Sequence, residues 1–245
     1  MRNIKITIAY DGSRYNGWQK QDHTDNTIQG KLEQLLSRMT GEIVEIHGSG
    51  RTDAGVHALG QVFHFHTECK MTVEEVMAYM TEYLPLDIAV LKVEDVPERF
   101  HSRLNVKWKT YCYHIWNSPI PNVFERKFSY HIPEKLDVDK MKEAASYLIG
   151  KHDFKSFCSN KRMKKSTVRI LESIQFEQDG DMILIRYTGN GFLYNMVRIL
   201  TGTLIEVGRG ERKPDEMQAI LDSRNREAAG FTALAQGLFM EGVEY

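Results

Sequence analysis

The hydrophobic residues of this chain repeat with a period of two in some segments and close to 3.6 in others, and the two periods alternate along the chain. Ile4, Ile6 and Ile8 fall on one face of an extended strand. The apolar residues of 28–39 then fall on one face of a helix, which we expect to end at Gly41. Such alternation predicts strands and helices packed in layers around a core.

Later segments continue this alternation. Thr72 and Glu75 have the spacing of a capping box and predict the start of a second helix. Two alternating runs flank the pair Asp179-Gly180 and predict a hairpin over residues 170–188. Further strands are expected at EIVEIHG, QVFHFHTE, DIAVLKV, KTYCYHIW and GLFMEGVEY, and further helices in 141–148, in FLYNMVRILTGTLIEVG and after Pro214. The pattern predicts an α+β fold with a largely antiparallel sheet flanked by helices, in two similar α/β halves at residues 1–100 and 101–245.

The composition fits a globular protein of one large or two modest domains. The chain has 245 residues, 42% of them hydrophobic and 27% charged, which allows a sizeable core. Its three cysteines (Cys69, Cys112 and Cys158) have no paired spacing, so we expect neither a disulfide framework nor a cysteine metal site. The start, MRNIKITIAYDG, lacks the apolar core of a signal peptide, and no stretch is apolar enough to span a membrane. We therefore expect a soluble, cytoplasmic protein.

One segment is strongly basic although the whole chain has a formal net charge of −1. Residues 151–169 hold seven Lys or Arg side chains against the single acid Asp153. Phe154 and Phe157 lie among these charges, and a combination of cations with aromatic rings is typical of nucleic-acid binding. The alternative is a solvated surface loop.

The stretch GSGRTDAGVHALGQV, residues 48–62, places Arg51 and Asp53 among four glycines. The dinucleotide-binding fingerprint would need glycine where Asp53 stands, and a phosphate-binding P-loop would need a GK[ST] ending, so both readings fail. A carboxylate remains in a loop whose glycines let the backbone approach a ligand, with Arg51 near enough to bind phosphate or pair with the acid. The alternative is that Asp53 only caps a turn.

One histidine lies within this stretch and two follow it. His64 and His66 share one face of a strand, as metal ligands can, but no third ligand has suitable spacing, so we do not expect a metal site. His57 is better placed to order the loop by hydrogen bonding than to act in acid-base catalysis.

Several segments resemble the tRNA pseudouridine synthase A (TruA) family in order and spacing. The segments are YDGSRYNGWQKQ, TIQGKLE, GSGRTDAGVHALGQV, LPLDIAV, FHSR, KTYCYHI, HDFKSF, GFLYNMVRILTG and AQGLFMEGVEY. Together they extend over essentially the whole chain, and GRTDAGVHA is highly specific to that family.

The resemblance implies an enzyme that converts uridine in RNA to pseudouridine without a metal, nucleotide or redox cofactor. It also implies the pseudouridine synthase fold, with its two halves around a central RNA-binding cleft. Asp53 matches the family's catalytic aspartate, whose carboxylate attacks C1′, adds to C6 or removes a sugar proton; the sequence leaves these three routes open.

Four further residues match positions that bind the substrate in the family. Tyr111 matches the tyrosine that stacks on the target base, although it also fits the apolar stripe of its strand. Arg198 matches the basic residue that pairs with the aspartate, and it lies off the apolar stripe of its helix. Arg51 and Arg103 match arginines that contact RNA, where ordinary surface arginines are the alternative.

The basic segment and two departures complete the site prediction. We expect the tRNA backbone to be gripped by the four densest charges, Lys161, Arg162, Lys164 and Lys165. Cys112 stands where the family often has arginine, and Tyr83 where asparagine is usual; neither change touches Asp53, Tyr111 or Arg198.

The most specific function that the resemblance implies is modification of anticodon stem-loop uridines in tRNA by a homodimer. A paralogue acting on another RNA such as rRNA, a non-catalytic RNA-binding protein and a small-molecule nucleotide enzyme are the alternatives. An intact Asp53 argues against a mere binder, and the missing phosphate motifs argue against the nucleotide enzyme.

Overall fold

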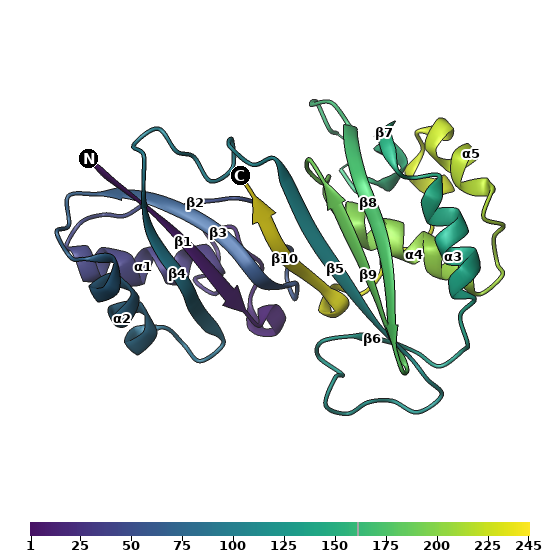
Figure 1. Ribbon diagram of the computed structural model, residues 1–245, viewed down its shortest axis with the longest axis horizontal. Helices are drawn as coiled ribbons and strands as arrows, with labels where there is room; N and C mark the ends of the chain where they lie inside the picture. The colour runs from purple at the N-terminus through teal and green to yellow at the C-terminus, as the bar shows by residue number, and fades with distance from the viewer. Residues whose placement is uncertain (161) are drawn as a thin grey trace. The chain divides into compact units, whose positions relative to one another are not determined.

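The computed structural model describes residues 1–160 and 162–245 and divides into two compact units (Figure 1). The first unit comprises Met1–Lys107 and Phe239–Tyr245, and the second comprises Trp108–Leu238. The sequence pattern predicts a division near residue 100, with the C-terminus in the second half. The chain instead returns to the first unit at its end, because the last strand pairs there.

The first unit contains a mostly antiparallel sheet of five strands. The strands are β1 (Arg2–Tyr10), β2 (His47–Gly48), β3 (His57–Thr67), β4 (Ile88–Val96) and β10 (Leu238–Glu244). The order is β4-β1-β3-β10, with β2 also paired to β3. β1 runs antiparallel to β3 and β4, whereas β10 runs parallel to β3, with Phe239 opposite His57.

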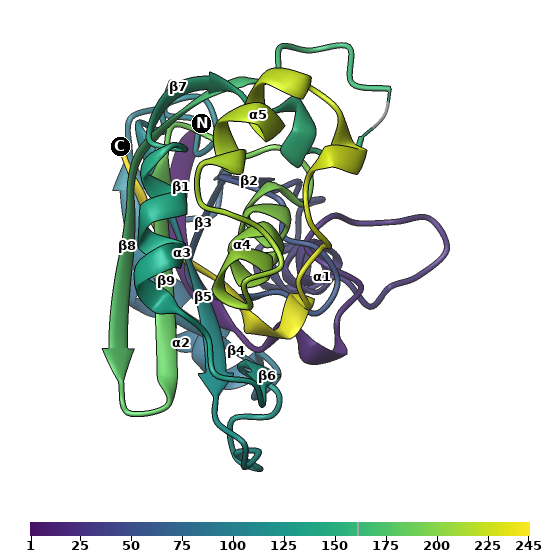
Figure 2. The same cartoon turned by 90° about the vertical axis from the view of Figure 1, so that its right-hand side faces the viewer.

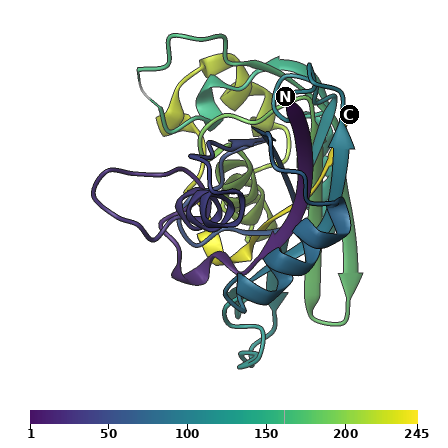
Figure 3. The same ribbon diagram turned by 90° about the vertical axis from the view of Figure 1, so that its left-hand side faces the viewer.

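Two helices and a short 3₁₀ turn accompany this sheet. They are α1 (Ile28–Thr40), α2 (Val73–Tyr83) and η1 (Gly12–Arg14). α1 lies over one face of the sheet and α2 contacts β4 and α1 (Figure 3). Gly41 ends α1 in the left-handed conformation, at φ 73°, and the capping box of Thr72 and Glu75 starts α2, so both sequence predictions are confirmed.

The strand expected at EIVEIHG is shorter than predicted, because side chains of α1 take its backbone donors. The carboxylate of Glu33 accepts from the Ile46 N–H at 3.3 Å, and the Ser37 hydroxyl accepts from the Val44 N–H at 3.0 Å. Only His47–Gly48 remains to pair with β3.

The second unit contains five further strands. The strands are β5 (Trp108–Asn117), β6 (Tyr130–Ile132), β7 (Gly150–Asp153), β8 (Val168–Asp179) and β9 (Met182–Gly189). They follow the order β5-β9-β8-β7 in antiparallel pairs, and β6 runs parallel to β5. The hairpin β8-β9 is confirmed, but Asp179 is the last paired residue and the turn consists of Gly180 and Asp181.

Three helices, α3 (Val138–Ser146), α4 (Met196–Gly208) and α5 (Glu216–Ser223), complete the second unit (Figure 2). Short 3₁₀ turns occur at η2 (Lys155–Phe157), η3 (Arg226–Ala228) and η4 (Ala235–Gly237). Both units thus combine a largely antiparallel sheet with helices, as the sequence predicted for an α+β protein. None of the helices within residues 1–160 and 162–245 has the length and apolar character needed to cross a membrane.

Helix α4 differs from the prediction in two ways. It starts at Met196 and not within FLYN, because Asn195 has a left-handed backbone, at φ 60°, that interrupts the helix. It is also buried on more than one apolar stripe, since Ile199, Thr201 and Thr203 are buried as well. The two threonine hydroxyls donate to carbonyls one turn earlier, and these hydrogen bonds offset the cost of burying the hydroxyl groups.

Candidate active site

Asp53 lies in the loop that joins β2 to β3. Its side chain is partly exposed, and its carbonyl accepts a hydrogen bond from the Val56 N–H at 3.1 Å. Ala54 and Gly55 form the tight turn between these two residues, and Gly55 has a φ of 78°, which glycine adopts without strain. The turn therefore fixes the backbone at Asp53 and leaves its side chain partly exposed.

A segment distant in sequence, residues 10–18, packs tightly against this loop. A Cβ on Gly12 would lie 1.9 Å from the Val56 carbonyl oxygen, and a Cβ on Gly17 would lie 2.8 Å from the Thr52 carbonyl oxygen. The Trp18 N–H donates to that same Thr52 oxygen at 3.0 Å. The two glycines therefore permit a contact between backbones that any side chain at either position would push apart.

Hydrogen bonds between buried polar groups also hold the loop in place. The hydroxyls of Tyr10 and Thr52 are hydrogen-bonded at 2.8 Å, and the amide of Gln61 donates to the Gly50 carbonyl at 2.9 Å. The Ser49 hydroxyl donates to the side-chain Oε1 of Gln61 at 2.7 Å. Burial raises the pKa of Tyr10 to about 12, so its hydroxyl remains protonated at neutral pH. The sequence segments contained these residues but gave no sign that they form one network.

His57 orders the loop, as expected from its position. Its Nδ1 accepts the Gly12 N–H at 3.0 Å, and its ring stacks on Phe239 with centroids 4.7 Å apart. An oxygen of Asp11 lies 3.2 Å from the same nitrogen. We assign Nδ1 as the acceptor, because the backbone N–H of Gly12 can only donate.

His64 and His66 belong to a cluster of histidine rings with His47 and His101. Neighbouring rings have centroids 4.7 to 5.7 Å apart. His64 is buried, its Nδ1 accepts the Ser102 N–H at 3.1 Å, and burial together with the neighbouring histidines lowers its pKa to about 4. Within residues 1–160 and 162–245, no three His, Cys, Asp or Glu side chains are arranged to hold a metal ion.

Arg51 and Arg103, expected to contact RNA, are both exposed in the first unit. Arg51 lies in the same loop as Asp53, two residues before it. Arg103 follows the histidine cluster, and its N–H donates to His101 Nδ1 at 3.1 Å. Both guanidinium groups are open to solvent, as contacts with a phosphate require.

Tyr111 and Arg198 lie in the second unit. Tyr111 is buried on β5, and its ring forms a T-shaped pair with the ring of Phe192, with centroids 5.0 Å apart. Arg198, on α4, donates from Nε to the Ala233 carbonyl at 2.7 Å and from Nη1 to the Asn195 side chain at 3.1 Å. Arg198 thus ties the start of α4 to the segment before η4.

The basic segment presents its cations to solvent but buries its aromatic rings. Arg162, Lys164 and Lys165 are exposed and make no ion pair within the described part of the chain, whereas Lys161 lies outside the described residues. Phe154 and Phe157 are fully buried, so the expectation that they could stack on bases is wrong. They anchor the segment, because their rings pack on each other with centroids 6.2 Å apart.

The two departures from the family pattern lie in different surroundings. Cys112 is buried on β5 directly opposite Arg186 of β9. Tyr83 is half exposed at the end of α2, and its ring lies against Tyr79 with centroids 4.5 Å apart.

These observations describe an aspartate in a loop whose backbone is held by buried hydrogen bonds and close contacts, a suitable arrangement for an anionic nucleophile or base. A family model described as tRNA pseudouridine synthase matches residues 6–105 and 144–245. Over all 245 residues of both chains, the protein is 51% identical to tRNA pseudouridine synthase A of Bacillus sp. (strain KSM-64). It is 48% identical, again over both full lengths, to tRNA pseudouridine synthase A 2 of Bacillus anthracis and to tRNA pseudouridine synthase A 1 of Clostridium tetani (strain Massachusetts / E88). The chain therefore belongs to the tRNA pseudouridine synthase family of isomerases.

Proposed function

We propose that this chain isomerises uridine to pseudouridine in the anticodon stem-loop of tRNA, with Asp53 as the catalytic carboxylate. The bond between C1′ and N1 breaks, the detached uracil rotates, and C1′ bonds to C5. The proton on C5 leaves and N1 gains one, so atoms balance without a redox partner. The observation that carries the proposal is the fixed loop around Asp53, supported by family membership.

A fixed carboxylate suits each of the three chemical routes. Attack at C1′, addition at C6 and removal of a sugar proton all need an anionic oxygen aimed at one atom of the nucleotide. A displacement on the order of 1 Å can cost about a hundredfold in rate, so the contacts of Gly12 and Gly17 with the loop have a catalytic purpose.

The remaining predicted residues receive roles in this proposal. Tyr111 packs against the target base, and Arg51 and Arg103 bind phosphates near it. The exposed cations of the basic segment bind the backbone farther along the RNA, which helps to offset the cost of flipping the uridine out of its stem. The predicted ion pair of Arg198 with Asp53, the homodimer and the cytoplasmic location also remain parts of the proposal.

Tritium release from tRNA transcripts labelled at C5 of uridine tests the proposal directly. The wild-type protein should release tritium, and Asp53→Asn should lower turnover by at least about a thousandfold, since it removes the anionic oxygen. Binding of tRNA should change by less than about threefold, because phosphate contacts dominate affinity. Asp25→Asn, at an exposed carboxylate outside the loop, is the matched control.

The other outcomes identify the alternatives. Release from rRNA transcripts but not from tRNA would reject the proposed substrate, and RNA binding without any release would indicate a non-catalytic protein. Normal turnover of Asp53→Asn would reject Asp53 as the catalytic residue.

A further inference from the structure

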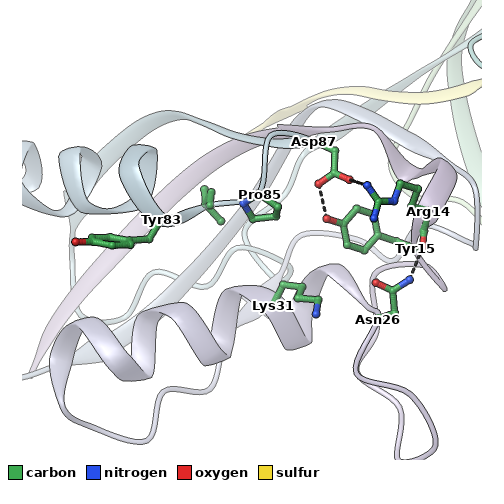
Figure 4. Close-up of a pocket in the computed structure, with 8 residues that line it drawn as sticks. Arg14, Tyr15, Asn26, Lys31, Tyr83, Pro85 and Asp87 are labelled. Carbon is green, nitrogen blue, oxygen red and sulfur yellow. Dashed lines mark hydrogen bonds and ion pairs between the residues drawn. The ribbon is translucent and has the colours of Figure 1, made fainter.

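A pocket of about 400 Å³ lies in the first unit beside η1, at the start of α1 (Figure 4). Six of the residues that line it are Arg14, Tyr15, Asn26, Lys31, Pro85 and Asp87. Its volume lies within the range of about 300 to 1,000 Å³ typical of ligand sites. The sequence analysis assigned no role to this group of residues.

We propose that this pocket binds one nucleotide of the substrate RNA, with the phosphate between Arg14 and Lys31. The sugar would lie against the apolar wall formed by Leu84 and Pro85. The inference rests on the proposed function, because it takes the ligand to be part of an RNA that Asp53 modifies. It adds a second fixed point on that RNA, outside the Asp53 loop.

The two cations of the pocket are available to a ligand. Arg14 keeps 82% of its side chain exposed, and its nearest carboxylate oxygen, on Asp87, is 3.9 Å away. Lys31 forms no ion pair with any residue in 1–160 or 162–245. Their side chains come from two different elements and border the same space (Figure 4). Such a pair is suited to a phosphodiester, which carries one negative charge and several acceptor oxygens.

The acidic residue of the pocket is already engaged. The Tyr15 hydroxyl donates to Asp87 at 2.5 Å, and the side chain of Asp87 is only 19% exposed. Burial, together with the adjacent Asp87 carboxylate, raises the pKa of Tyr15, so this hydroxyl remains a donor at neutral pH. The hydrogen bond directs part of the Asp87 charge away from the space between the cations.

The pocket is also formed in advance. The Asn26 amide donates to the Arg14 carbonyl, and the Asp11 N–H donates to the Asp87 carbonyl at 2.9 Å. These bonds hold η1 against the segments before α1 and β4. The dipole of α1 adds positive potential at its N-terminal turn, where Lys31 lies. Its amides are occupied, since Thr27 accepts from Gly30 and Lys31, so ligand contacts fall to the side chains.

The segment that forms the pocket is the one that fixes the catalytic loop. Gly12 and Arg14 are the two ends of η1; Gly12 touches Val56 of the Asp53 loop, and its N–H donates to His57, the first residue of β3. Arg14 borders the pocket from the other end of this single turn. A nucleotide bound at Arg14 is therefore held at a constant distance from Asp53, which helps to align the RNA.

Charge removal at the pocket tests the inference. The double variant Arg14→Gln, Lys31→Gln should weaken tRNA binding about tenfold near 0.15 M salt and reduce the slope of log K against log salt by up to about 1.8. KM should rise while turnover at saturating tRNA stays within about twofold, because neither residue touches the reacting atoms. Asp87→Asn should strengthen binding a few-fold, since among the described residues it removes the one carboxylate that lines the pocket while leaving an acceptor for Tyr15. If the pocket residues had only a structural role, removing its cations would not weaken tRNA binding while removing its carboxylate strengthens it.

A matched control and the wild-type activity make the result decisive. Arg38→Gln, Lys70→Gln removes two exposed cations of the same unit outside the pocket and should leave binding nearly unchanged. Equal weakening by both double variants would overturn the inference, because the effect would then be one of overall charge. If the wild type releases tritium from tRNA and the pocket variant binds normally, the inference fails alone; if the wild type releases none, the proposed function has failed.

Titration with uridine monophosphate separates an RNA site from a site for free nucleotides. We expect this probe to bind the wild type weakly and to compete with tRNA. If it binds, loses that binding in the pocket double variant, and yet does not compete with tRNA, the pocket is a free-nucleotide site and the inference is overturned.

Discussion

The Asp53 loop and the basic segment between β7 and β8 are both connections between strands, but they are held in different ways. The Asp53 loop is fixed along its length by buried hydrogen bonds and by backbone contacts with Gly12 and Gly17. The basic segment is held by buried contacts in its first half, where Phe154 and Phe157 are buried and the Ser159 N–H donates to the Tyr194 carbonyl at 3.1 Å. At its end, the Thr167 hydroxyl donates to Asp153 at 2.5 Å, while Arg162, Lys164 and Lys165 between these points are exposed.

This difference corresponds to the chemistry proposed for each region. A carboxylate that attacks one atom needs a fixed position, because a small displacement has a large cost in rate. Cations that bind a phosphate backbone act through net charge and tolerate variable geometry. The first region should therefore respond strongly to changes in packing, and the second mainly to changes in charge.

Among the changes that leave Asp53 itself in place, the largest expected effect follows from Gly12→Ala. The added Cβ would lie 1.9 Å from the Val56 carbonyl oxygen, so the Asp53 loop must shift. We expect the free energy of unfolding to fall by about 3 kcal/mol and turnover to fall at least about a hundredfold. Urea unfolding and tritium release measure the two effects. Gly242→Ala, where a Cβ has no neighbour within 4 Å, is the control and should resemble the wild type. Normal stability and turnover of Gly12→Ala would show that the loop is not pinned from this side.

Elements with local signals were predictable from the sequence. Gly41, the capping box of Thr72 and Glu75, and the hairpin of β8 and β9 depend on residues close together in the chain, and the structure confirms each. The turn of that hairpin is shifted by one residue, because Asp179 still pairs with Met182.

Elements that depend on distant contacts were not predictable. The start of α4 is set by Asn195, whose side chain donates to Ser159 and accepts from Arg198. The parallel pairing of β10 with β3 joins residues far apart in sequence, and no local pattern announces it. The burial of Phe154 and Phe157 was missed because a charged sequence can still direct its aromatic residues inward.

The same distinction applies to the candidate site. The resemblance identified Asp53 as one residue in a motif, but it could not show that Gly12 and Gly17 touch its loop. The pocket of Arg14 and Lys31 likewise exists only after η1 and α1 have been placed together.

Arg198→Met is expected to have the second largest effect. It removes the hydrogen bonds to the Ala233 carbonyl and to Asn195, which join α4 to the segment before η4. We expect a loss of about 2 kcal/mol in unfolding free energy, together with reduced turnover. Arg198→Lys should recover part of the stability. Activity lost with an unchanged melting temperature would place the role of Arg198 at the substrate and not in packing.

The third prediction concerns the dependence of stability on pH, through the buried His64 next to the strand that leads into the Asp53 loop. His64 pairs with His47 of β2, the strand that leads into this loop. Its pKa is lowered to about 4 in the folded protein, whereas an unfolded histidine has a pKa near 6.5, so the unfolded state binds the proton first. Stability is therefore full above pH 6.5 and decreases as the pH falls toward 4.

Unfolding of His64→Gln at several pH values measures this contribution. Glutamine can still accept the Ser102 N–H but does not titrate, so the variant should show a flatter dependence on pH than the wild type. His23→Gln, at an exposed histidine, should leave the dependence unchanged. Identical slopes for His64→Gln and the wild type would show that the burial of His64 is not linked to stability.

The smallest effect on stability is expected in the basic segment. Replacing Lys161, Arg162, Lys164 and Lys165 with glutamine should change the unfolding free energy by less than about 0.5 kcal/mol, since the described members are exposed. Binding of tRNA should weaken, and the slope of log K against log salt should fall by about 0.9 for each lost duplex phosphate contact. Turnover at saturating tRNA should be largely retained.

Phe154→Leu supplies the opposite case within the same segment. Its ring is fully buried against Phe157, so we expect a loss of about 1 kcal/mol in stability with little change in the salt dependence of RNA binding. The fourfold glutamine variant should therefore change RNA binding but not stability, and Phe154→Leu should change stability but not RNA binding. If the fourfold glutamine variant binds tRNA with an unaltered salt slope, the cations of this segment are a solvated surface. The contrast with the Asp53 loop would then be one between a functional connection and an ordinary one.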